Sequence, residues 1–257
     1  CTKDLFEEAL FARDRNLFSN RELDLVFFDT TTLFFEGAGG QTLGKRGHSK
    51  DRRPDHPQVV VGVVLDSQAN PICCEIWPGN TADVATLVPL AERLQMRFGI
   101  QRVCIVADRG MISKETIRDL EELNWLYILG ARMRAQKEVT DQVLGRAGRY
   151  QVIREEGGES KDPEPLKVKE VRVEDRRYVV CLNDAQARKD AAERQTILES
   201  LEEKLTRGPR QFIGNRGYRK FLKVEGGRMV VDQAAVQREE RFDGKWVLRT
   251  NTTFEAS

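Results

Sequence analysis

The sequence contains few of the residues that build zinc sites, disulfide frameworks or membrane spans. It has five cysteines and two histidines in 257 residues. It has no Cys-X-X-Cys motif or Cys/His cluster, which argues against structural zinc. The cysteine number is odd, and most cysteines stand in apolar, strand-like runs, which indicates buried thiols in a reducing cytosol. No run approaches the roughly 20 apolar residues of a membrane helix, and no signal peptide is recognisable, so we expect a cytoplasmic protein.

A formal net charge of +1 gives no sign of a nucleic-acid partner, but the charge is unevenly distributed. Residues 37–57, which are rich in Gly and Arg, predict a long loop, and loops of that length are usually functional or mobile. Only Asp51 and Asp55 oppose its positive charge. A basic loop beside a metal site would suit a phosphodiester substrate, and a solvated surface loop is the alternative. The candidate DNA-binding residues in it are Lys45, Arg46, His48, Lys50, Arg52, Arg53 and His56.

Two aspartates in apolar, β-type stretches are the strongest functional signal. Asp29 lies in the apolar run 25–35, with apolar residues on both alternating faces, as in a strand covered on two sides. An ionised carboxylate there needs a cation, a cage of hydrogen bonds or a shifted pKa. Asp108 follows a second short apolar strand, 102–107, where a turn begins. Two carboxylates on inner strands of one sheet suit Mg²⁺ or Mn²⁺, and the alternative is two polar residues at a strand bend and a turn.

Before residue 134, the predicted order of elements is three strands, a helix, a strand, a helix and a strand. The strands are expected at 25–36, 58–65, 71–77, 102–107 and 125–129, after an N-terminal helix over about 3–18. One helix begins with Asn80 or Thr81 as its cap and ends at Gly99, and Pro89 kinks or restarts it. Ser113 caps the next helix.

From about Arg134 the sequence predicts short strands separated by turn signals, with one helix over about 185–205. These strands are expected at 151–154, 166–173, 177–182, 221–225, 229–232 and 245–249. Near Thr252 a further helix begins.

Six runs carry a family resemblance. They are Phe27-Phe28-Asp29-Thr30-Thr31, Asp55-His56-Pro57-Gln58-Val59-Val60-Val61-Gly62, Trp77-Pro78-Gly79-Asn80-Thr81-Ala82-Asp83, Val106-Ala107-Asp108-Arg109-Gly110-Met111, Arg177-Tyr178-Val179-Val180-Cys181 and 242–252. In this order they resemble bacterial insertion-sequence transposases of the DDE class. The last two look like the β-rich insertion that these enzymes carry between the second Asp and the final Glu. The resemblance covers most of the chain from Leu25 onward.

The resemblance implies an α/β, ribonuclease H-like mixed sheet with flanking helices and a β-rich insertion domain. The domains would be an N-terminal helical segment (1–24), the first part of the catalytic core (25–133), the insertion with one helix (134–249) and the start of the rest of the core (250–257). Asp29 and Asp108 match the first two catalytic, metal-binding acids, and Arg109 is a phosphate contact or a surface ion pair.

The reaction implied is metal-dependent phosphodiester hydrolysis and strand transfer of a DNA element. The implied cofactor is Mg²⁺ or Mn²⁺. The implied partners are double-stranded DNA and a second copy of the chain, in a bacterial cytoplasm near the nucleoid.

The third acid of the family's pattern is not found. It lies in a helix with Tyr, then Arg three residues on, Glu four beyond and Lys seven beyond the Glu. The residues three positions after the tyrosines are Gly130, Ile153, Cys181 and Phe221, and Glu255 comes too early. We therefore expect that both ends are cut, that the final Glu lies beyond Ser257 and that most of an N-terminal DNA-recognition region is missing.

Two other functions remain open from the sequence. In a haloacid-dehalogenase-type phosphohydrolase Asp29 would be the nucleophile, but Thr31 stands where that class has a second acid. The predicted antiparallel hairpin also conflicts with its parallel sheet. A non-catalytic, truncated DNA-binding relic is the other alternative.

Overall fold

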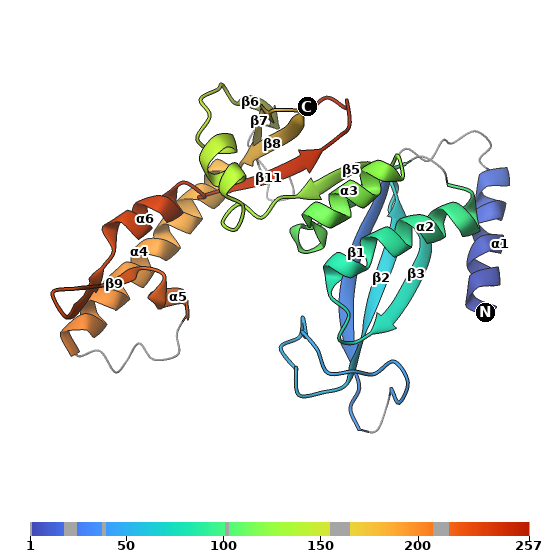
Figure 1. Ribbon diagram of the computed structural model, residues 1–257, viewed down its shortest axis with the longest axis horizontal. Coiled ribbons are helices and arrows are strands. Elements are labelled where there is room, and N and C mark those ends of the chain that lie inside the picture. Colours follow the sequence, from blue (N-terminus) through green and yellow to red (C-terminus); the bar gives the residue numbers. More distant parts are fainter. Residues whose placement is uncertain are drawn as a thin grey trace. The chain divides into compact units, whose positions relative to one another are not determined.

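The computed structural model describes residues 2–17, 25–37, 40–100, 103–154, 165–207 and 216–256. The chain divides into two compact units, which are shown in one ribbon in Figure 1. Unit 1 comprises Cys1–Arg132 and Leu248–Phe254, and unit 2 comprises Met133–Val247 and Glu255–Ser257. In the sequence, most of unit 2 therefore lies between the two segments of unit 1.

Unit 1 is built on a mixed β-sheet. Strands β1, β2 and β3 form an antiparallel meander, and β4 and β5 run parallel to β1. The strand order is β3-β2-β1-β4-β5-β11, with the end of β11 antiparallel to β5. This is the ribonuclease H-like arrangement, and the predicted fold class is confirmed. The bounds are β1 (Leu25–Phe34), β2 (Gln58–Asp66), β3 (Pro71–Pro78), β4 (Cys104–Ala107), β5 (Leu126–Gly130) and β11 (Lys245–Thr250).

Helices α2 (Leu87–Phe98) and α3 (Lys114–Glu122) lie against one face of this sheet (Figure 1). Their apolar positions and the facing strand residues form one buried cluster, which includes Phe28, Leu90 and Leu120. Gly99 ends α2 with a φ of 64°, a left-handed conformation that favours glycine. Ser113 caps α3 by accepting a hydrogen bond from Thr116 N at 2.9 Å. The predicted helix end at Gly99 and the predicted cap at Ser113 are therefore correct.

The helix predicted to start at Asn80 or Thr81 begins later. Asp83–Ala85 (η1) form a single 3₁₀ turn, and α2 starts at Leu87 after Thr86. Pro89 therefore lies in the first turn of α2, where its missing N–H costs no intrahelical hydrogen bond. Of the two effects predicted for Pro89, the structure shows a restart.

Strand β1 is covered on one face. Val26, Phe28, Thr30 and Thr32 are buried, and the residues between them are exposed. Phe27 is 42% exposed and Leu33 is 55% exposed, although both are apolar. The prediction of a strand covered on two sides is therefore wrong for the part of the chain that the structure describes. The error arose because apolar residues also occupy the open face.

Helix α1 (Thr2–Leu17) lies beside β3 (Figure 1) and is attached to it by polar contacts. Lys3 Nζ donates to the carbonyl oxygen of Cys74 at 2.6 Å, and Cys74 N donates to Glu7 Oε1 at 2.9 Å. Arg97 of α2 pairs with Glu7 at 2.9 Å and with Glu75 at 3.2 Å. A charge network therefore joins α1 to both layers of unit 1.

Unit 2 contains more helix than the sequence predicted. Strands β6, β7 and β8 form an antiparallel set, and β9 and β10 form a separate pair. The prediction of one helix is wrong, because unit 2 contains α5 and α6 in addition to α4. Helix α6 has only eight residues and buries only Ala235 and Val236, so its sequence shows little helical periodicity. The bounds are η3 (Val139–Val143), β6 (Gln151–Arg154), β7 (Leu166–Val173), β8 (Arg176–Leu182), α4 (Asp184–Arg207), α5 (Arg216–Arg219), β9 (Leu222–Glu225), β10 (Arg228–Val231) and α6 (Gln233–Glu240).

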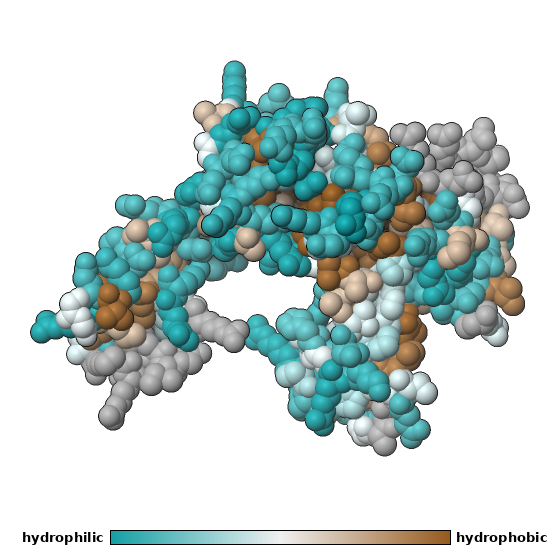
Figure 2. Space-filling model, in the orientation of Figure 1, coloured by the Kyte–Doolittle hydropathy of each residue, from teal (hydrophilic) through white to brown (hydrophobic). Residues whose placement is uncertain are grey.

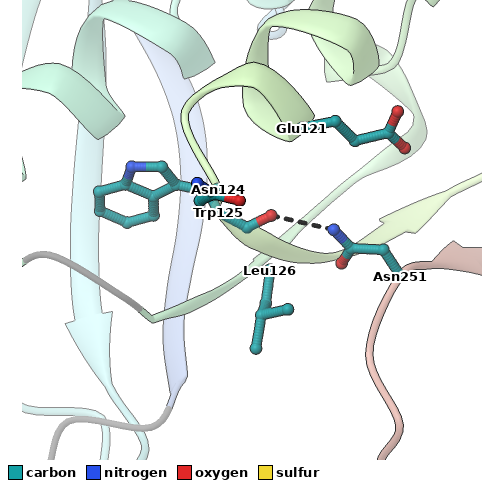
Figure 3. A pocket seen from close by; sticks show the side chains of 5 residues that line it. All are labelled: Glu121, Asn124, Trp125, Leu126 and Asn251. Carbon is teal, nitrogen blue, oxygen red and sulfur yellow. Dashed lines mark hydrogen bonds between the residues drawn. The ribbon is translucent and has the colours of Figure 1, made fainter.

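Residues 251–256 form neither helix nor strand, so the helix expected near Thr252 is also wrong. Asn251 instead extends the contact with β5, because its side chain accepts from Tyr127 N at 2.8 Å and donates to Trp125 O at 3.0 Å. It lines a pocket of about 470 Å³ with Glu121, Asn124, Trp125 and Leu126 (Figure 3).

The described cysteines are free thiols, and three of them are buried. Burial raises the pKa of Cys73 and Cys104 to about 12 and that of Cys181 to about 11, so these thiols are protonated at neutral pH. Cys1 lies outside the described residues. Among the helices within the described ranges, none is both long and apolar enough to cross a membrane.

Candidate active site

The pairing of β1 with β4 brings Asp29 and Asp108 to neighbouring positions. Phe28 pairs with Ala107 in this parallel ladder, and each aspartate is the next residue along its chain. Neighbouring strands lie about 4.8 Å apart, so the two backbones are adjacent where the acids emerge. Both residues are exposed, and the Asp29 side chain is 80% exposed. Water therefore solvates the Asp29 carboxylate, and the desolvation cost inferred from the sequence does not apply.

The turn that follows Asp108 is held from the end of β5. Asp108 has an extended backbone and leads into the 3₁₀ turn Arg109–Met111 (η2). Arg132 donates to the carbonyl oxygens of Arg109 at 3.0 Å and Gly110 at 2.9 Å. A Cβ at Gly130 would lie 2.8 Å from Arg109 N, so only glycine allows this approach. Arg132 and Gly130 therefore position the turn that follows Asp108.

Asp83 is a third carboxylate beside these two segments. Thr30 Oγ1 donates to Asp83 Oδ1 at 2.9 Å. A Cβ placed on Gly110 would lie 3.3 Å from Asp83 Oδ2, so Asp83 also adjoins the turn after Asp108. From the sequence, Asp83 was only an acidic residue in the first turn of a helix. The available signal was its place at the end of the run 77–83 that carries the family resemblance.

Lys50 is directed toward the acidic residues. Its ammonium group lies 3.8 Å from Asp29 Oδ1 and 4.0 Å from Asp83 Oδ2. It also donates to Thr30 Oγ1 at 3.0 Å and to the Thr30 carbonyl oxygen. The sequence had assigned Lys50 to DNA; in the structure its charge is engaged within unit 1.

The other basic residues of the loop fall into two groups. Lys45, Arg46, His48 and Arg52 are exposed, and the face of unit 1 shown in Figure 2 is mostly hydrophilic over this loop. The loop backbone is anchored, because Lys45 exchanges two hydrogen bonds of 3.0 Å with Gln58. The loop thus presents charged side chains from a fixed base.

Arg53 and His56 form the second group, on the ring of Phe34. Arg53 is paired with Asp55 at 3.4 Å, and His56 Nε2 lies 3.1 Å from the same carboxylate. Arg53 also hydrogen-bonds to His56, and its guanidinium carbon lies 5.3 Å from the Phe34 ring centroid. Arg109, the remaining predicted DNA contact, is exposed beside Asp108.

The chemistry of the donor atoms fits a divalent metal ion. Asp29 and Asp108 offer exposed carboxylate oxygens, the ligands that Mg²⁺ and Mn²⁺ prefer. Within the described ranges, no three His, Cys, Asp or Glu side chains form a group able to hold a metal ion. Asp29 and Asp108 would by themselves fill only part of the coordination shell of such an ion.

The comparison with protein families decides what kind of domain this is. The transposase DDE domain family matches residues 21–220, which is well over half of the chain. The chain belongs to the transposase DDE domain family. The predicted membership of the DDE transposases is thereby confirmed.

Solved transposases are also similar to this DDE domain, at low identity. The Mos1 transposase paired-end complex with the left transposon end is 20% identical over 49% of this chain, with a TM-score of 0.29. The Mos1 mariner paired-end complex with Mn is 22% identical over 49%, with a TM-score of 0.29. The piggyBac transposase synaptic complex with hairpin DNA is 11% identical over 98%, with a TM-score of 0.38. The match spans 40% of each of those chains. No curated protein matches with statistical significance.

Proposed function

We propose that this DDE domain supplies two acids, Asp29 and Asp108, of a metal-dependent centre that cleaves and rejoins DNA phosphodiester bonds. The observation that carries the proposal is the register of β1 and β4, which makes the two aspartates neighbours across the ladder. Their exposure leaves the carboxylate oxygens accessible to a metal ion and to a phosphate group.

The residues around the two acids have positioning roles in this proposal. Arg132 and Gly130 hold the turn after Asp108, and would thereby fix the backbone from which its carboxylate extends. Strand β1 fixes the backbone of Asp29, and Thr30 N donates to its carboxylate at 2.7 Å. When bound, Mg²⁺ or Mn²⁺ would stabilise negative charge on the attacking and leaving oxygens of an in-line displacement.

The substrate in this proposal is double-stranded DNA, at the ends of an insertion element and at its target. The exposed basic residues of the loop, Lys45, Arg46, His48 and Arg52, together with Arg109, would contact phosphates. Excision and reinsertion of the element would take place with a homodimer on the DNA, in a bacterial cell near the nucleoid. Family membership and the position of the basic loop support this part of the proposal.

A further acidic ligand belongs to the proposed centre. Two carboxylates leave the shell short, and metal-dependent catalysis depends on fixed geometry as well as on occupancy. The family resemblance predicts that this ligand is a Glu in a helix with the Tyr, Arg, Glu and Lys pattern. We therefore expect residues 1–257 alone to bind Mn²⁺ weakly and to cleave DNA poorly or not at all.

Manganese binding and strand cleavage test the proposal separately. Free Mn²⁺ can be titrated by electron paramagnetic resonance with the wild-type chain, Asp29→Asn, Asp108→Asn and the control Asp119→Asn. We expect each of the first two variants to bind Mn²⁺ about tenfold more weakly, as loss of a carboxylate ligand and its charge requires. Unchanged binding in both would refute the metal centre. Strong Mg²⁺-dependent cleavage of labelled DNA by residues 1–257 would refute the need for a third acid.

The structure argues against one of the two alternative functions and is compatible with the other. The antiparallel pairing of β1 with β2 does not match the parallel sheet of a haloacid-dehalogenase-type phosphohydrolase. A DNA-binding relic without catalysis is compatible with the finding that, in the part of the chain that the structure describes, no three His, Cys, Asp or Glu side chains form a metal-binding group. It predicts normal DNA binding and no metal-dependent cleavage.

A further inference from the structure

The ammonium group of Lys50 lies within 4.0 Å of four oxygen atoms of unit 1, and its side chain is 36% exposed. It donates to the carbonyl and hydroxyl oxygens of Thr30 and lies 3.8 Å from the Asp29 carboxylate and 4.0 Å from that of Asp83. Two carboxylates, a hydroxyl and a carbonyl oxygen are the donor types that bind hard cations. The positive charge of Lys50 therefore occupies a place that suits a metal ion.

The Thr30 hydroxyl hydrogen-bonds to both Asp83 and Lys50. Its hydroxyl is buried, with the residue 3% exposed, and it lies 2.9 Å from Asp83 Oδ1 and 3.0 Å from Lys50 Nζ. A hydroxyl has one proton to donate. An ionised carboxylate can only accept a hydrogen bond, and an ammonium group can only donate one. The hydroxyl donates to Asp83 and accepts from Lys50. Thr30 thus links the two charged groups in a defined orientation.

The backbone of the loop supports the same placement. Lys50 N donates to Thr32 Oγ1 at 3.0 Å, two residues further along β1. Thr32 is buried and points to the same face of the strand as Thr30. Both the backbone and the side chain of Lys50 are therefore docked on β1.

We propose that Lys50 is a positioning residue whose ammonium group, held by Thr30 and Asp83, sits beside Asp29 and competes there with a divalent cation. This inference rests on the proposed metal-binding role of Asp29. The competition is electrostatic and steric, since the ammonium group lies 3.8 Å from Asp29 Oδ1 and would repel a divalent ion bound to that oxygen. Occupation of the centre by metal accordingly requires Lys50 to withdraw from Asp29.

The test is a Mn²⁺ titration by electron paramagnetic resonance on the full 257-residue chain at low ionic strength. Lys50→Met keeps the aliphatic stem and removes the charge, and it should bind Mn²⁺ about tenfold more tightly. Lys45→Met removes an exposed lysine from the same loop and serves as the matched control. Its affinity should equal that of the wild type.

A second pair of variants tests the link through Thr30. Thr30→Val keeps the shape of the side chain but removes the hydroxyl, so Lys50 loses one of its two hydrogen bonds to Thr30 and Mn²⁺ affinity should again rise. Thr30→Ser keeps the hydroxyl and should bind as the wild type does. Circular dichroism establishes that each variant is folded. If Thr30→Val does not fold, the comparison of Lys50→Met with Lys45→Met decides by itself.

Equal or weaker Mn²⁺ binding by Lys50→Met, relative to the wild type, overturns the inference. Asp29→Asn separates this failure from failure of the proposed function. If Asp29→Asn weakens Mn²⁺ binding while Lys50→Met changes nothing, the metal role of Asp29 stands and the role of Lys50 is wrong. If Asp29→Asn changes nothing, the metal role of Asp29 is wrong, and the inference about Lys50 is wrong with it.

Discussion

Replacement of Arg97 by Met should destabilise unit 1 by detaching α1 from β3 and α2. Arg97 lies within 3.5 Å of four carboxylates, those of Asp4, Glu7, Glu8 and Glu75. The side chains of Arg97, Glu7 and Glu75 are 12%, 11% and 7% exposed. The variant keeps the aliphatic part of the side chain and leaves the buried carboxylates of Glu7 and Glu75 without one of their cationic partners.

The expected loss of unfolding free energy depends on which ion pairs of Glu7 and Glu75 remain in the Arg97→Met variant. Removing one partner of a buried ion pair costs about 3–5 kcal/mol. Lys3 still lies 3.1 Å from Glu7, and Arg93 still lies 3.1 Å from Glu75, so part of the charge stays compensated. We therefore expect a loss of about 3 kcal/mol in the free energy of unfolding, at the low end of that range. Burial raises the pKa of Glu75, so protonation of its carboxyl group limits the loss further at acidic pH.

Urea denaturation followed by tryptophan fluorescence measures this loss. Trp77 and Trp125 belong to unit 1 and Trp246 to unit 2, so a Trp246→Phe background restricts the signal to unit 1. Arg118→Met is the matched control, because Arg118 is exposed and pairs with Asp119 on the surface of α3. Its midpoint should equal that of the parent. A loss below about 1 kcal/mol for Arg97→Met, or a midpoint equal to that of the control, would refute the reasoning.

Three further predictions concern pH, the edge of β5 and the basic loop. Burial alone would raise the pKa of Glu7, but hydrogen bonds from Cys74 N, Arg97 and Lys3 outweigh it and hold the pKa below 4.5. Because the folded-state pKa is depressed, this stabilisation is complete above pH 4.5 and is lost as the pH falls through the folded-state pKa. The free energy of unfolding of Glu7→Gln should therefore fall less steeply with decreasing pH than that of the wild type. Parallel curves of unfolding free energy against pH would contradict this. Asn251→Ala removes two hydrogen bonds to the β5 backbone and should cost about 1–2 kcal/mol in the same urea assay, whereas an unchanged midpoint would show that water replaces them. Replacing Lys45, Arg46 and Arg52 together by Ala should weaken DNA binding regardless of DNA sequence. The slope of log affinity against log salt concentration should become shallower by about 0.9 for each phosphate that is no longer neutralised. Unchanged affinity and slope would show that these residues do not contact DNA.

Elements set by local physical chemistry were predictable. Strands β6 and β7 match their predicted bounds, and Ser113 and Gly99 end their helices as their types suggest. These features depend on side chains within a few residues of one another, through alternation, capping and backbone preference. The short helix α6 was missed because eight residues with two buried positions give too little periodicity.

The candidate site was predictable only in part. Asp29 and Asp108 stand out in the sequence, because a carboxylate in or after an apolar strand is unusual. The roles of Asp83 and Lys50 were not visible. Asp83 hydrogen-bonds to Thr30 although 53 positions separate them in the sequence, and Lys50 hydrogen-bonds to Thr30 over a separation of 20 positions. Contacts of that kind depend on where a loop returns to a sheet, which local patterns do not determine.

By itself, the sequence determined which segments are strands, where several helices begin and end, and that two aspartates occupy or follow apolar strands. The family resemblance also lay in runs that can be read directly. Only the tertiary structure decided that one face of β1 is exposed, that the ammonium of Lys50 lies beside Asp29 and Asp83, and that Arg132 holds the turn after Asp108. The physical reason is one of range: alternation and capping act between neighbours in the chain, whereas burial, ion pairing and register are settled between segments that meet only after folding.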